Sequence, residues 1–94
     1  MTYEESKVLW KLEKDGFDKV AKTEVAEELF KLVDELINSD TILYQDFIDM
    51  IMKQMYNMSE TDNIDERKQQ IQDMYSTVLE HFKKIKDERS KEIR

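Results

Sequence analysis

The only histidine, His81, is the first side chain to consider, because imidazole is a common metal ligand and proton carrier. Helical bundles that hold two iron or manganese ions use Glu-x-x-His pairs on facing helices. Three residues before His81 stands Val78, so this chain lacks that pattern. We therefore predict no metal site, and a packing or edge position for His81.

Asp46 and Asp49 are three residues apart, a spacing that places two carboxylates on one side of a helix. Paired carboxylates perform acid–base catalysis when burial pushes their pKa values apart. Here both lie on a polar stripe that includes Lys53 and Asn57, where solvent should surround them. The spacing therefore does not predict a catalytic pair.

Gly16 is the only glycine, which excludes a glycine-rich phosphate loop. A calcium loop with Gly16 at its sixth position would place Lys11 and Lys22 at the two terminal ligand positions, and ammonium groups cannot coordinate a cation. No serine has the Gly-x-Ser-x-Gly context of a hydrolase nucleophile. We therefore expect no catalytic residues and no cofactor, and we predict that the protein is not an enzyme.

The elements that carry these residues are predicted from composition and spacing. The 94 residues include no proline and no cysteine, so the usual punctuation of strands and hairpins is missing. We predict a single all-α domain over residues 1–94. It should be a compact antiparallel helical bundle of three long helices plus a shorter N-terminal helix, with a charged helical C-terminal extension at about 86–94.

Apolar spacing predicts four helices, over residues 2–14, 17–37, 41–58 and 64–90. The first should place Val8 and Leu12 on its buried face and end at the turn Asp15-Gly16.

The last predicted helix carries an apolar residue every seven positions, at Ile64, Ile71, Val78 and Ile85. This repeat predicts a bundle seam. Because this helix is the longest, its end should overhang the bundle or pair with the first helix.

The segment 42–58 carries eleven large apolar or aromatic side chains. A helix that is apolar around most of its circumference is normally central to a bundle or buried in a partner, and we expect the other helices to enclose this one. Flexible thioethers also suit surfaces that grip partners. Met52, Met55 and Met58 are therefore candidate partner-binding residues, with core filling as the alternative.

Two further surfaces are candidates for binding a partner. Trp10 lies off the expected Val8–Leu12 face and is either an exposed anchor, as tryptophan often is at interfaces, or simply buried. Glu24, Glu27 and Glu28 form an acidic surface that would compete with nucleic acid for a basic protein groove.

The net charge of −7 argues against nucleic-acid binding, although residues 83–94 carry six basic and three acidic side chains. The absence of cysteine, of a signal peptide and of a membrane span favours a cytoplasmic protein.

We expect a non-enzymatic, small, acidic protein-binding regulator or inhibitor of bacterial or phage origin, of the immunity, antitoxin or anti-defence type. The alternatives are a structural homodimer without a separate partner, and a weak nucleic-acid binder that uses the basic tail. The sequence does not identify the partner protein.

Overall fold

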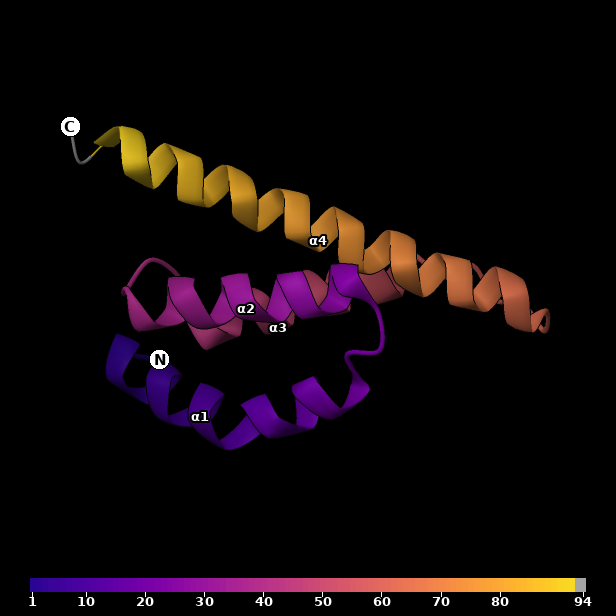
Figure 1. Ribbon diagram of the computed structural model, residues 1–94, viewed down its shortest axis with the longest axis horizontal. Coiled ribbons are helices and arrows are strands. Elements are labelled where there is room, and N and C mark those ends of the chain that lie inside the picture. The colour runs from indigo at the N-terminus through magenta and orange to yellow at the C-terminus, as the bar shows by residue number, and fades with distance from the viewer. Residues whose placement is uncertain (93–94) are drawn as a thin grey trace.

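The computed structural model describes residues 1–92, which form four helices and no strand (Figure 1). The helices are α1 (Tyr3–Val20), α2 (Glu24–Asn38), α3 (Tyr44–Tyr56) and α4 (Ile64–Glu92). The all-helical prediction is confirmed. The predicted shorter N-terminal helix is wrong, because α1 has 18 residues while α2 has 15 and α3 has 13. None of the helices in this range is both long and apolar enough to cross a membrane.

The first helix does not end at Asp15-Gly16 but continues to Val20. Gly16 lies inside the helix without a positive φ, and Phe17 stacks on Trp10 with ring centroids 5.6 Å apart. Since residues seven apart share a helix face, this contact favours an unbroken helix between the two rings. The break comes after Val20 instead, and the Thr23 hydroxyl begins the next helix by accepting a hydrogen bond from the Ala26 N–H at 3.3 Å.

The central helix is α2, which Figure 1 shows between α1 and α4. Seven of its side chains are buried: Ala26, Leu29, Phe30, Leu32, Val33, Leu36 and Ile37. In α3 only Phe47 is fully buried, so the prediction that the segment 42–58 is enclosed by the other helices is wrong. Its apolar residues surround the helix on nearly every side, and the contacts with α1 and α4 cover only part of that circumference.

The core is built around an aromatic cluster that joins all four helices. The Phe47 ring lies 5.8 Å from Trp10, 6.3 Å from Phe30 and 6.2 Å from Phe82, measured between ring centroids. Two of these contacts are edge-to-face, an arrangement that aromatic quadrupoles favour. This cluster fixes one face of α3 against the core and leaves the opposite face outside.

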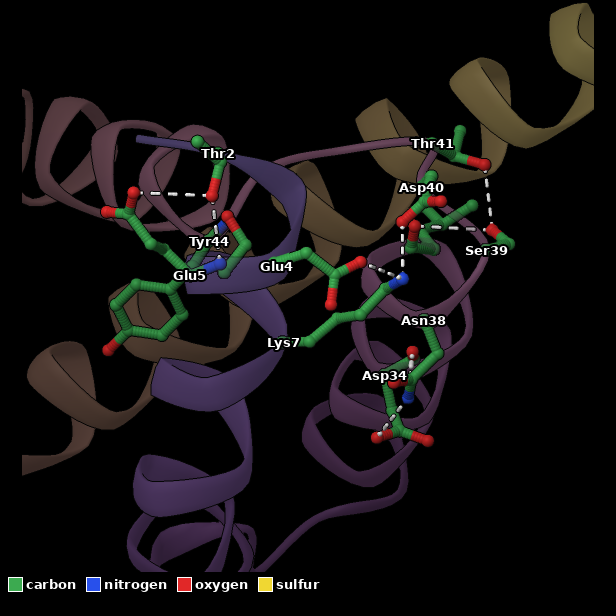
Figure 2. A network of polar contacts seen from close by, with 12 residues as sticks. Thr2, Glu4, Glu5, Lys7, Asp34, Asn38, Ser39, Asp40, Thr41 and Tyr44 are labelled. Atoms are coloured by element: carbon green, nitrogen blue, oxygen red, sulfur yellow. Dashed lines mark hydrogen bonds and ion pairs between the residues drawn. The ribbon is translucent and has the colours of Figure 1, made fainter.

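A polar network ties the start of α1 to the turn between α2 and α3 (Figure 2). The Lys7 ammonium lies 2.8 Å from Asp40, whose φ of 57° makes it a left-handed residue at the end of α2. The Thr41 N–H donates to the Leu36 carbonyl at 2.9 Å, which completes a Schellman-type helix end. Buried Ser6 accepts the Tyr44 N–H at 3.0 Å and so positions the start of α3 beside α1.

The seam of α4 is buried only in its middle. Val78 is buried, Ile71 and Ile85 are half-buried, and Ile64 is 70% exposed. The overhang was expected at the end of this helix, but Figure 1 shows the start of α4 extending past the other helices. Within the predicted extension at about 86–94, Lys86 is tied to α2 by an ion pair with Glu35 at 2.9 Å, and residues 93–94 lie outside the described range.

Candidate protein-binding surface

Trp10 is not an exposed anchor. Its side chain is 2% exposed, and the indole Nε1 donates a hydrogen bond of 2.7 Å to Asp34 Oδ1. The residues expected on the buried face of this helix, Val8 and Leu12, are 60% and 72% exposed. The helix is therefore rotated relative to the prediction, because the aromatic residues Trp10 and Phe17 occupy the core side.

The acidic candidates on α2 have different surroundings. Glu28 forms an ion pair of 3.2 Å with Lys83 of α4, so its negative charge already has a positive partner within the fold. Glu24 and Glu27 are exposed in the first turn of α2, where negative charge complements the helix dipole. Of the three acidic candidates, Glu28 is therefore paired with a lysine of α4. Glu24 and Glu27 instead stabilise the first turn of α2.

The methionine candidates lie at the end of α3. Met52 and Met55 are 61% and 58% exposed, while Met58 is half-buried and packs against the core. Tyr56, which the sequence did not single out, is 92% exposed. Because Met52 and Tyr56 are four residues apart, they share one helix face, with Met55 beside them. We call these three residues the α3 apolar surface.

A hollow of about 480 Å³ opens where α3 ends and α4 begins. Met55, Tyr56 and Met58 form its apolar wall, and Glu60 and Asp62 of the connecting segment contribute an acidic wall. Three acidic residues, Glu60, Asp62 and Asp65, stand between Asn57 and Glu66, with no basic residue among them. Arg67 of α4 lines the hollow as well, so the apolar surface is bordered by two negative charges and one positive charge.

A second hollow, of about 380 Å³, lies further along between α3 and α4. Asp46 and Asp49 line it together with His81. Both carboxylates already accept hydrogen bonds, Asp46 from the Leu43 N–H at 2.8 Å and Asp49 from the Gln45 amide at 2.7 Å. In the described part of the chain, no group of three or more metal-binding side chains comes together.

Sequence reasoning missed Tyr56, Glu60 and Asp62. The signal available was the change from a methionine-rich helix to an acidic connection within a few residues, a pattern that places apolar and negative groups side by side. The chain matches no protein family, no curated protein sequence and no solved structure.

Proposed function

We propose that this protein acts by binding another protein through the α3 apolar surface, and that it performs no catalysis. The observation that carries the proposal is the exposure of Met52, Met55 and Tyr56, each more than half open to solvent within five residues. Full burial of such a side chain is worth about 1.5–3 kcal/mol. Clustered exposed apolar side chains with a polar rim are typical of interaction sites, and thioethers adapt to a partner's shape.

The acidic charge and small size fit a regulator or inhibitor of a bacterial or phage protein, of the immunity, antitoxin or anti-defence type, acting in the cytoplasm. Negative charge supports this role because it speeds and directs the encounter with a basic target surface.

For the arrangement of helices we propose an antiparallel bundle. The start of α1 lies beside the end of α2, as the contact between Lys7 and Asp40 requires. The start of α3 lies near the C-terminal half of α4, since Phe47 contacts Phe82. These contacts support opposite directions for α1 and α2, and for α3 and α4.

A homodimer through the same surface is the first alternative. It would bring two copies of the acidic connection containing Glu60 and Asp62 together, which like-charge repulsion opposes. Light scattering at low micromolar concentration distinguishes the two: a monomer supports a separate partner, and a dimer that persists at every salt concentration supports self-assembly.

Nucleic-acid binding through the tail is the second alternative. Lys83 and Lys86, two of its basic residues, form ion pairs with Glu28 and Glu35 of α2. This use within the fold reduces the positive charge available to phosphates. Absence of a gel shift at low salt would remove the alternative.

The proposal is tested by placing a photocrosslinking amino acid at position 52 in cells that express the protein. A matched control carries the same amino acid at position 8, because Val8 is as exposed as Met52 but lies on α1. We expect one discrete crosslinked protein from position 52 and none from position 8. Identical products from both positions, or none from either, would contradict the proposal.

A further inference from the structure

Three hollows follow one another along the seam between α3 and α4, and we call them together the α3–α4 groove. The first lies between Met50 and Phe82, and the third lies at Met55 and Arg67. The middle one, of about 250 Å³, shares Met58, Ser59 and Gln70 with the third. On α4 the lining runs from Arg67 to Ile85, which corresponds to about 27 Å at the rise of an α-helix.

The lining of the groove includes apolar residues with adaptable shape. They come from both helices and include three methionines: Met50, Met58, Met74, Phe82 and Ile85. These side chains are buried or half-buried and already touch the core, so they form a supported lining. A partner's apolar stripe can pack on such a lining without reorganising the fold.

The charged residues along the groove are predominantly acidic. Five carboxylates line it: Asp46, Asp49, Glu60, Asp62 and Asp73. Two basic residues, Lys53 and Arg67, also line it, so five negative and two positive charges give −3 with His81 neutral.

None of these groove charges takes part in an ion pair within residues 1–92. On α2, by contrast, Glu28, Asp34 and Glu35 each lie within 4 Å of a lysine ammonium. The fold thus pairs these three acidic side chains of α2 with lysines, whereas the groove carboxylates have no ion pair among the described residues. A ligand that brings positive charge gains most at the groove, because it meets carboxylates that have no cation of their own.

We propose that the α3–α4 groove receives a cationic amphipathic helix of the partner protein, with its apolar stripe on the methionine-containing lining and its basic side chains at the carboxylates. A helix of about 18 residues matches the length of the groove. This inference rests on the proposed function and specifies the partner's chemistry. A second copy of this chain, or an anionic polymer, would place negative charge against negative charge.

The test uses a synthetic 18-residue peptide that forms a helix with leucines on one face and lysines on the other, labelled with a fluorophore. Anisotropy titration of the full-length protein should show one-to-one binding that weakens as salt rises. A peptide of the same composition with leucines and lysines scrambled around the helix should bind at least tenfold more weakly, because it has no continuous apolar stripe.

Two protein variants with equal charge change separate groove binding from general attraction. The groove variant Asp49→Asn/Glu60→Gln/Asp62→Asn should lose about tenfold in affinity, since each exposed pair contributes only modestly. The control Glu13→Gln/Asp15→Asn/Asp18→Asn should stay within about twofold of the unmodified protein, because those exposed residues of α1 do not line the groove. Thermal melting of both variants verifies that each is folded.

Equal weakening by both variants, equal binding of a leucine–glutamate peptide, or a dimer of the free protein that excludes the peptide would each overturn the inference. A protein captured from position 52 that carries no basic amphipathic segment would overturn it as well, yet would leave the proposed function standing. Failure of the crosslinking experiment together with absence of peptide binding would contradict both the proposed function and the inference about the groove.

Discussion

The indole Nε1 of Trp10 and the carboxylate of Asp34 are joined by a hydrogen bond of 2.7 Å that connects α1 to α2. The same carboxylate oxygen lies 3.4 Å from the Lys14 ammonium and accepts from the Asn38 side chain at 3.2 Å. Asp34 is thus the acceptor for three groups, one of which is a buried N–H. A buried donor without an acceptor is costly, so this pair should matter for stability.

Asp34→Ala should lower the free energy of unfolding by about 2 kcal/mol, because it leaves the Trp10 N–H without its acceptor. Asp34→Asn should cost less, since an amide oxygen can still accept from the indole. Urea unfolding followed by tryptophan fluorescence measures both. The matched control is Asp15→Ala, an exposed acidic residue on α1, which should change stability by less than about 0.5 kcal/mol. Equal stabilities for the Asp34 and Asp15 variants would contradict the assigned role.

Gly16→Ala should raise the free energy of unfolding by about 0.5–1 kcal/mol. The residue lies inside α1, its φ is not positive, and an added Cβ would meet no atom within 4 Å. Alanine then removes conformational freedom from the unfolded chain at no steric cost to the folded one. Chemical denaturation measures the change, and a loss of stability would show that the chain turns at this glycine.

Gly16 is a position at which the local sequence pattern predicted the wrong structure. A lone glycine after an aspartate is a good helix terminator, and the local pattern predicted that role. The contact between Trp10 and Phe17, about two helical turns apart, places both rings against the core, and this packing outweighs a local preference of about 1 kcal/mol. Local chemistry does account for the start of α1, where the Thr2 hydroxyl accepts a hydrogen bond from the Glu5 N–H at 3.1 Å.

Alkaline pH should destabilise the protein through Lys7 and Tyr44. A hydrogen bond to Asp40, followed by its charge, raises the pKa of Lys7, and burial, followed by the charge of Glu13, raises the pKa of Tyr44. In both cases the folded state holds its proton more tightly than the unfolded state does. The stabilisation is therefore complete below the unfolded-state pKa values of 10.5 and 10.0 and is lost as pH rises through the folded-state values.

Melting temperatures between pH 8 and pH 11.5 check this expectation, with Tyr44→Phe as the comparison. The variant lacks the phenol that titrates, so its melting temperature should fall less steeply above about pH 10. Parallel curves for the two proteins would show that Tyr44 contributes nothing to the alkaline loss.

Val78→Asp should unfold the protein, because Val78 is fully buried and a carboxylate there would have no partner. The matched change Ile64→Asp, at the exposed start of α4, should leave stability within about 0.5 kcal/mol. Circular dichroism of the two variants tests which part of the seam is in the core. Unfolding by both, or by neither, would contradict the position of α4.

The contrast between α2 and α3 shows what composition does and does not determine. Apolar content alone favoured the segment 42–58 as the central helix. In α2, however, Leu29, Val33 and Leu36 lie on one broad face and can be covered by two neighbours at once. In α3 the apolar residues extend around the helix, so Met52 and Tyr56 have no neighbour to cover them. Periodicity identified the helices, but which face each neighbour covers depends on the whole fold.

Oxidation of methionine by dilute hydrogen peroxide, followed by mass spectrometry, tests most directly whether the α3 apolar surface is free in the isolated protein and covered in the complex. In the free protein Met52 and Met55 should oxidise several times faster than buried Met74. Addition of the crosslinked partner, in purified form, or of the leucine–lysine peptide should slow Met55 and leave exposed Met1 unchanged. Slow oxidation of Met52 and Met55 in the free protein, or no protection of Met55 by either ligand, would contradict the account.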